Sequence, residues 1–101
     1  MRSYTKKYLD ELKLDETSFC GCEVCGCRAT EIHHITARSK YKEGLNKIEN
    51  IMAICRSCHQ NLGDKKSKMI FLLETHWQFL IDNGVKFDEN YFIEKIIKYE
   101  N

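Results

Sequence analysis

The chain has 101 residues, of which 43% are hydrophobic and 31% are charged, and its formal net charge is +1. This composition is typical of a soluble globular chain with one modest core; it excludes a disordered chain, and the small net charge excludes a polycationic coat for DNA but not a local basic surface. No apolar run approaches the roughly 18 residues that a membrane span needs, and the N-terminal segment has no apolar signal core, so we expect a cytoplasmic protein that does not enter a membrane.

The first half of the chain predicts one short helix and two short strands. The apolar spacing of residues 4–14 favours an amphipathic helix, and residues 15–27 form a loop punctuated by cysteine and glycine. Residues 29–35 alternate weakly between polar and apolar side chains and predict a strand. A polar, basic loop over 36–48 separates it from a second strand over 50–54.

The second half of the chain predicts helices. One helix begins at Arg56 and breaks at the glycine-aspartate pair that follows, where Asp64 is placed to cap the next helix over 65–82. An asparagine-glycine pair ends that helix, and residues 89–99 predict a last one, capped by the preceding aspartate, Asp88.

We expect one α+β domain, 1–101, built from three segments. A central unit at 20–64 follows an N-terminal helix in 1–19 and precedes a helical extension at 65–101. Residues 20–68 carry nine basic and five acidic side chains, whereas residues 69–101 carry three basic and six acidic ones. Any affinity for polyanions should therefore lie in the central unit. The acidic helices either pack over that unit to enlarge its core or form a docking surface.

Six cysteines in this chain suggest a metal site. Two Cys-x2-Cys pairs are separated by 29 residues, and such paired spacing without a secretion signal favours a tetrahedral zinc site over disulfides. A reduced or disulfide-bonded cluster is the alternative. Cys20 and Cys27 flank the first pair, and either thiol can take the place of a neighbour there. The predicted zinc ligands are Cys22, Cys25, Cys55 and Cys58.

The residues between and after these pairs follow a specific order. They read Glu31-Ile-His33-His34-Ile35, then Glu49-Asn50-Ile51, then Cys55-x2-Cys58-His59. With the strings CEVCGCRATEIHHI and IENIMAICRSCH, residues 20–64 resemble the HNH endonucleases, or ββα-metal nucleases, in their zinc-knuckle branch. The resemblance implies a zinc-stapled ββα unit inside the α+β domain. Small proteins that resemble this one are often encoded by bacteria or their phages.

The resemblance implies a metal-dependent DNA endonuclease or nickase that hydrolyses phosphodiester bonds. By its motif, His34 is the general base that activates a water, and Asn50 holds the loop between the strands and so orients that base. His33 and His59 hold a catalytic divalent ion, with Mg²⁺ favoured, although Mn²⁺, Ni²⁺ or Zn²⁺ also suit two imidazoles. Double-stranded DNA contacted along its backbone is the implied partner, and a monomer is the favoured state.

Elementary geometry adds conditions to this interpretation. Adjacent strand residues point to opposite sides, so His33 and His34 serve one site only at a bulge or a strand end. Colicin-type nucleases carry a third histidine one turn after the helix ligand; here that position is Gly63, which leaves the identity of the ion open. Glu31 is either a partner of the metal-binding histidines or a solvated strand carboxylate. His76 lies on an apolar stripe and is expected to be a hydrogen-bonded core histidine.

Basic side chains near the motif either contact phosphate or form a solvated face. Such phosphate contacts position a nucleic-acid backbone without reading its sequence. A zinc-stapled module that binds nucleic acid or protein without turnover is the alternative function. The predicted nucleic-acid-binding residues are Arg38, Lys40, Lys42, Arg56, Lys65 and Lys66, with Arg38 the best candidate for direct contact.

Overall fold

Two short antiparallel strands lie at the centre of the computed structural model, which describes residues 1–100. Strand β1 (Glu31–His34) pairs with β2 (Ile51–Ile54) so that His34 lies opposite Ile51. All four residues of β2 are buried, as its uninterrupted apolar sequence requires, because a strand covered on both faces has no polar side to alternate with. Both predicted strands are present, but β1 is three residues shorter than expected and β2 is one residue shorter.

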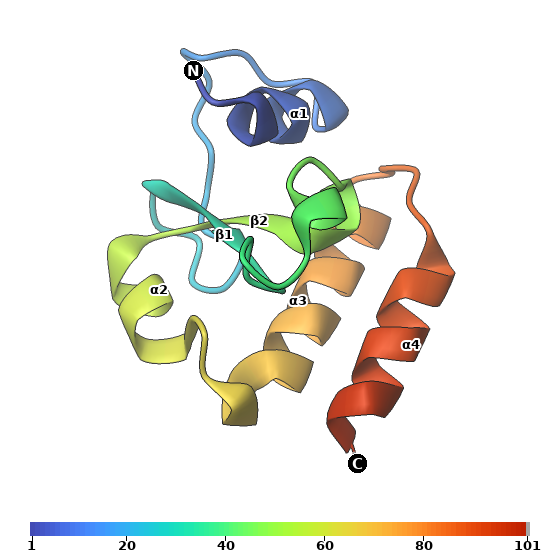
Figure 1. Cartoon of the computed structure of the whole chain (residues 1–101). Coiled ribbons are helices and arrows are strands. Elements are labelled where there is room, and N and C mark those ends of the chain that lie inside the picture. The colour runs from blue at the N-terminus through green and yellow to red at the C-terminus, as the bar shows by residue number, and fades with distance from the viewer. Residues whose placement is uncertain (101) are drawn as a thin grey trace.

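Helices cover the sheet from different sides. In Figure 1, α1 lies above the strands, α3 lies below them with α4 beside it, and α2 lies at one end of the sheet. Short 3-10 turns fill the loop between the strands and the junction before α3. The bounds are α1 Ser3–Glu11, α2 Arg56–Leu62, α3 Met69–Asp82, α4 Glu89–Glu100, η1 Lys42–Gly44, η2 Ile48–Asn50 and η3 Lys66–Lys68.

Two predicted helix boundaries are wrong. The helix expected over 65–82 begins only at Met69, because Asp64 has a left-handed backbone (φ +59°) and a helix cap requires an extended one. The first helix ends at Glu11, where Lys13 is left-handed and the Leu14 amide donates to the Leu9 carbonyl at 2.8 Å, a common way to close a helix.

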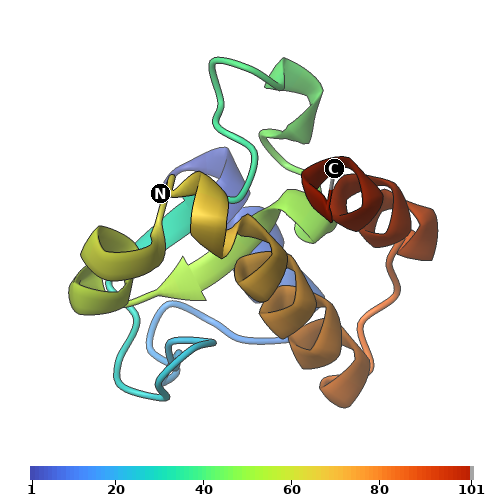
Figure 2. The same ribbon diagram turned by 90° about the horizontal axis from the view of Figure 1, so that it is seen from below.

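The last helix begins where the sequence predicted. The Asp88 carboxylate accepts a hydrogen bond from the Asn90 amide at 3.0 Å, which satisfies a free donor in the first turn of α4. This helix lies alongside α3 in both ribbon views (Figures 1 and 2), and the rings of Trp77 and Phe92 stack with their centroids 5.4 Å apart. The C-terminal helices therefore enlarge the core, as expected.

One apolar core joins the three predicted segments. Tyr8 from α1, Ile51 from β2, Leu72 from α3 and Phe92 from α4 are all fully buried in the same cluster. Burying a large apolar side chain contributes about 1.5–3 kcal/mol, so the flanking helices add substantially to what the small central unit buries alone. None of the helices in the described part of the chain combines the length and the apolar character needed to cross a membrane.

A buried polar network fixes the first cysteine pair to the helices. His76 is fully buried; its Nδ1 lies 2.7 Å from a Glu23 carboxylate oxygen and its Nε2 lies 2.6 Å from the carbonyl oxygen of Ile48. The other Glu23 oxygen accepts a hydrogen bond from the Tyr8 hydroxyl at 2.7 Å. The expectation of a hydrogen-bonded core histidine is confirmed. The network holds the loop that carries Cys22 against α1 and α3.

Candidate active site

The four cysteines of the two Cys-x2-Cys pairs gather at one end of the sheet. Their sulfur atoms all lie within 4.8 Å of one another, and the Cys25 and Cys55 sulfurs are 3.7 Å apart. Tetrahedral zinc with Zn–S bonds of about 2.3 Å places its sulfurs roughly 3.8 Å apart, so this cluster has the size of a zinc site. Cys20 and Cys27 lie outside it. The four clustered cysteines are Cys22, Cys25, Cys55 and Cys58.

The chemistry of these thiols also suits a cation. Burial acts to raise the pKa of Cys22, but backbone amides of Cys25, Cys55 and Val24 outweigh it and lower that pKa to about 7. Burial and the neighbouring thiols raise the pKa of Cys58. Four sulfurs this close cannot all be thiolates unless a positive ion shares them. The donor set therefore fits zinc.

The second pair of cysteines also places a histidine. Cys55 precedes the first residue of α2, and its sulfur accepts a hydrogen bond from the Cys58 amide at 3.4 Å. His59 follows immediately, and its ring centroid lies 4.8 Å from that of His33 on β1. The thiol cluster and the helix start thus bring a helix imidazole beside a strand imidazole.

His33 presents an unpartnered nitrogen to this region. The residue is only 3% exposed, and its Nε2 has no hydrogen-bond partner among the described residues. Burial, helped by the neighbouring His59, lowers the pKa of His33 to about 4. A buried polar atom without a partner is costly, and a neutral imidazole nitrogen is a metal ligand, so the arrangement fits a cation.

His59 is oriented by a carboxylate. Its Nδ1 lies 2.9 Å from an oxygen of Glu31, which leaves Nε2 as the ring nitrogen able to bind an ion. Metal-binding histidines commonly donate their second nitrogen in this way. Glu31 is therefore a hydrogen-bond partner of His59 and not merely a solvated strand carboxylate.

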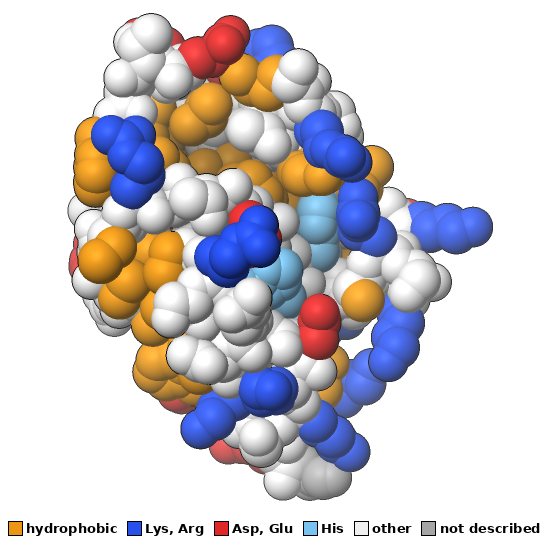
Figure 3. All heavy atoms as spheres, turned by 90° about the vertical axis from the view of Figure 1, so that its left-hand side faces the viewer, with side chains coloured by type: hydrophobic (Ala, Val, Ile, Leu, Met, Phe, Trp, Pro, Cys, Tyr) orange, Lys and Arg blue, Asp and Glu red, His pale blue; other side chains and the backbone are white. Residues whose placement is uncertain are grey.

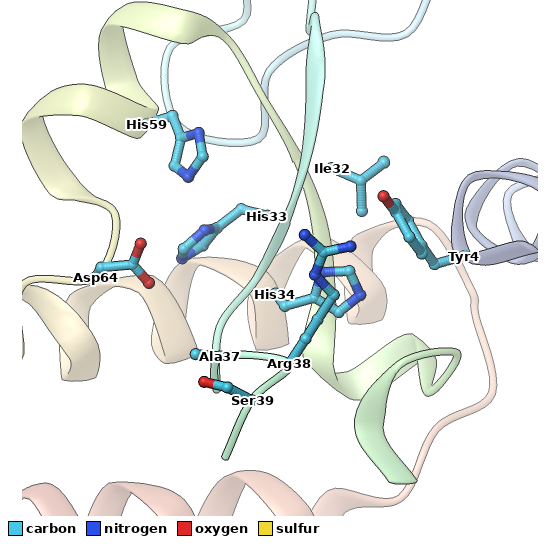
Figure 4. Close-up of a pocket in the computed structure, with 9 residues that line it drawn as sticks. All are labelled: Tyr4, Ile32, His33, His34, Ala37, Arg38, Ser39, His59 and Asp64. Atoms are coloured by element: carbon cyan, nitrogen blue, oxygen red, sulfur yellow. The ribbon is translucent and has the colours of Figure 1, made fainter. Parts of the chain in front are cut away.

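His34 is the last residue of β1, so it lies at a strand end, one of the two positions at which it and His33 can serve one site. Figure 4 shows its ring on the opposite side of β1 from His33, next to Arg38 and Tyr4. Its Nε2 lies 3.0 Å from the Leu45 carbonyl oxygen, and the Tyr4 ring meets it edge-on with centroids 4.6 Å apart. Burial lowers the pKa of His34; the Leu45 carbonyl opposes this and the Arg38 charge adds to it. A proton on Nε2 leaves Nδ1 free to accept another.

His33, His34 and His59 line one pocket of about 460 Å³. In Figure 4 the carboxylate of Asp64, from the turn after α2, points toward His33 on the side where His59 lies. Sequence reasoning missed Asp64 as a site residue, because the same aspartate before a helical pattern also suits a cap. It missed Tyr4 as well, because the apolar pattern of a helix does not show which part of the fold that helix packs against. The lining residues are Tyr4, Ile32, His33, His34, Ala37, Arg38, Ser39, His59 and Asp64.

Asn50 ties down the loop between the strands. Fully buried, it accepts a hydrogen bond from the Thr36 amide at 2.8 Å and donates to the carbonyl oxygens of Thr36 and Gly44 at 3.1 and 3.2 Å. The Tyr91 hydroxyl of α4 donates to the same side-chain oxygen at 2.6 Å. Because Leu45 follows Gly44, this clamp also holds the carbonyl that the His34 ring contacts.

The predicted phosphate-contacting residues divide into two groups. Arg38 lines the histidine pocket, and Lys40 and Lys66 line a neighbouring hollow. Lys42, Arg56 and Lys65 are exposed but lie outside the linings of both hollows. Figure 3 shows histidine side chains within a hollow of this face, with Lys and Arg side chains around it.

Comparison with known proteins agrees with this geometry. Residues 22–65 match the family described as HNH endonuclease. Over 78 residues the chain is 34% identical to a protein named mitochondrial DNA mismatch repair protein mutS homolog, from Sarcophyton glaucum. That alignment covers 64% of this chain but 8% of the relative, so the chain spans less than a tenth of the relative's length. No solved structure matches the chain.

Proposed function

We propose that this protein is a metal-dependent HNH endonuclease or nickase that hydrolyses phosphodiester bonds in DNA. The observation that carries the proposal is that His33, His34 and His59 line one pocket, within the segment that matches the HNH family. The three rings supply what the reaction needs: a base for the attacking water and ligands for an ion beside the phosphate.

The chain's own donors for the ion are two imidazoles and a carboxylate. The unpartnered Nε2 of His33 and the ring nitrogen of His59 that faces away from Glu31 are the nitrogen ligands. Asp64 supplies negative charge and a hard oxygen donor from the same pocket, which favours Mg²⁺ or Mn²⁺ over softer ions. When bound, such an ion neutralises charge on the phosphate and on the leaving oxygen.

His34 takes the proton of the attacking water. The Leu45 carbonyl holds the proton on Nε2, so Nδ1 is the accepting atom, and the Tyr4 ring packed edge-on restricts the imidazole to one orientation. Asn50 is a positioning residue: it fixes the loop that supplies this carbonyl. Arg38, in the same pocket, offers a cation for a phosphate oxygen.

The four clustered cysteines hold a structural zinc in this proposal. The ion joins the loop around Cys22 to the start of α2, and so determines where His59 lies relative to His33. Small zinc-stapled units fold around their metal, so the catalytic geometry depends on this second, non-catalytic site.

Conversion of supercoiled plasmid to relaxed or linear forms tests the proposal. The zinc-loaded protein is freed of loosely bound ions by gel filtration and assayed with Mg²⁺, with Mn²⁺ and without added ion. We expect cleavage only when a divalent ion is added. Plasmid that stays intact in every condition, with DNA still bound, would replace the nuclease by a zinc-stapled binding module.

A further inference from the structure

A second hollow adjoins the histidine pocket. Its volume is about 560 Å³, and it shares Ala37 and Asp64 with the pocket that holds the three histidines. Its walls come from three parts of the chain that are distant in sequence: the loop after β1, the turn before α3, and the C-terminal half of α4. Besides Asp64, the charged and aromatic residues that line it are Lys40, Lys66, Lys95, Lys98, Tyr41 and Tyr99.

The four lysines make this hollow a concentrated positive surface. Among the described residues none of them takes part in an ion pair. Lys95 is held over aromatic rings, with its Nζ 5.0 Å from the Tyr41 ring centroid and 5.6 Å from that of Tyr91. Burial and the charge of Lys98 lower the pKa of Lys95. In the described part of the chain these lysines form no ion pair, although Asp64 lines the same hollow and the charge of Glu94 opposes the lowering of the Lys95 pKa.

The composition of the C-terminal segment does not predict positive charge at this place. Residues 69–101 carry twice as many acidic as basic side chains. Even so, Lys95 and Lys98, two of the three lysines in that segment, line the hollow that adjoins the histidine pocket. The fold therefore adds cationic groups from an acidic helix to those of the HNH unit.

We propose that this hollow, which we call the lysine groove (Lys40, Lys66, Lys95 and Lys98), binds the phosphate backbone of the DNA strand that runs through the histidine pocket. Lysine ammonium groups neutralise backbone phosphates independently of sequence, and the Tyr41 and Tyr99 rings give sugars or bases an apolar face to pack against. The proposal rests on the nuclease function for its substrate. It adds that α4, outside the HNH unit, holds the strand on one side of the cleavage point.

Asp64 lies where the lysine groove meets the histidine pocket, and its negative charge bears on whether one DNA strand can pass through both. Asp64 lines both hollows and is the acidic residue in their linings, so it would repel a phosphate passing between them. A divalent ion held by the residues of the histidine pocket would offset the negative charge of Asp64 and so reduce that repulsion. The groove and the proposed ion site are therefore compatible on one strand.

Binding measured without cleavage tests the groove separately from the nuclease. The full zinc-loaded chain carries His34→Ala, no further divalent ion is added, and anisotropy of a labelled duplex and of the matching single strand is followed over a salt series. Lys95→Gln/Lys98→Gln removes two groove charges. Lys13→Gln/Lys86→Gln removes two exposed charges outside the groove as a matched control. Lys95→Arg/Lys98→Arg keeps the charge and reports on folding.

We expect the groove variant to bind about tenfold more weakly. The slope of log K against log salt should fall in magnitude by about 1.8, since each phosphate contact to duplex DNA contributes about 0.9. The arginine variant and the control should bind as the parent does, and the comparison of duplex with single strand identifies which form the groove prefers. A groove variant with the affinity and salt slope of the control would overturn the proposal, whether or not the wild type cleaves DNA. Loss of affinity for an acidic peptide but not for DNA would also overturn it.

Discussion

A β-carbon on Gly63 would overlap Cδ2 of His59 and lie 2.6 Å from the His59 carbonyl oxygen. Gly63 closes α2, and its amide donates to that same carbonyl at 2.8 Å. Colicin-type nucleases carry a third histidine at the position of Gly63. Because glycine has no side chain, the His59 ring can fill the space that a side chain at this position would occupy. Asp64, one residue later, lines the pocket with a carboxylate instead.

Gly63→Ala should therefore displace the His59 ring. Overpacking of this kind costs about 1–3 kcal/mol, which is too little to unfold a zinc-stapled domain but enough to move a ligand by a few tenths of an ångström or more. We expect cleavage to fall at least tenfold while zinc content stays the same. Asn61→Ala, on the exposed side of the same helix, is the control and should retain wild-type activity. Equal rates for the two variants would mean that the His59 position is not critical.

Asp64→Asn should weaken the binding of Mn²⁺ or Mg²⁺ at the histidine pocket. The change removes the negative charge that faces His33 but keeps the size of the side chain, so the loss reflects electrostatics and donor strength. Titration calorimetry of the zinc-loaded protein with Mn²⁺ should give an affinity lower by about tenfold. Asp82→Asn, at the exposed end of α3, is the matched control. Unchanged Mn²⁺ affinity in Asp64→Asn would remove the carboxylate from the ion site.

Cys58→Ser should abolish stable folding, whereas Cys27→Ser should not. Zinc binding in small stapled units contributes on the order of 10 kcal/mol, as much as the whole stability of a domain. Cys27 is an exposed thiol outside the four-sulfur cluster, so its loss should leave both zinc content and the thermal transition unchanged. Metal analysis and circular dichroism measure the two effects. A zinc-free but cooperatively folded Cys58→Ser protein would contradict the stapling role.

Stability should decrease in alkaline solution because of Tyr8 and Tyr91. Burial, with the Glu23 carboxylate beside Tyr8, raises the pKa of both hydroxyls above their usual value. A group whose folded-state pKa is raised adds its full stability below its unfolded pKa, which is about 10 for tyrosine, and loses it as the pH rises above that value. Each such group should reduce the free energy of unfolding by up to about 1.4 kcal/mol per pH unit there.

Urea unfolding of the wild type and of Tyr8→Phe between neutral and alkaline pH separates this contribution. The variant should be less stable at neutral pH, because Glu23 loses a hydrogen bond, but its stability should fall less steeply above about pH 10. Parallel curves for the two proteins would show that Tyr8 ionises as readily in the folded chain as in the unfolded one.

The sequence predicts the central unit well because its constraints are local or follow a fixed order. Paired cysteines specify a knuckle by spacing, an uninterrupted apolar run specifies a buried strand, and the order of His33, His34, Asn50 and His59 carries the family resemblance. The structure brings the three histidines to one pocket and puts the Asn50 side chain across the loop that the resemblance assigned to it.

The rest depends on tertiary packing that a linear pattern does not contain. Asp64 fits a helix cap in the sequence, but its left-handed backbone turns it into the histidine pocket instead. Tyr4 contacts His34 only because α1 crosses the sheet at that strand end. Lys95 and Lys98 belong to an acidic segment, and only the packing of α4 against α3 and the strand-connecting loop places them beside the histidine pocket.

We expect the His34 imidazole to take a proton from water during DNA cleavage, and this can be measured as the rate at which His34→Ala nicks supercoiled plasmid. A positioned general base contributes about 10²–10⁴-fold to a rate, so with Mg²⁺ or Mn²⁺ the variant should lose activity by that factor. Its zinc content, thermal transition and DNA affinity should match the wild type, and His34→Gln, which keeps a polar side chain of similar length, should be equally inactive. Nicking by His34→Ala at the wild-type rate would show that His34 is not the general base.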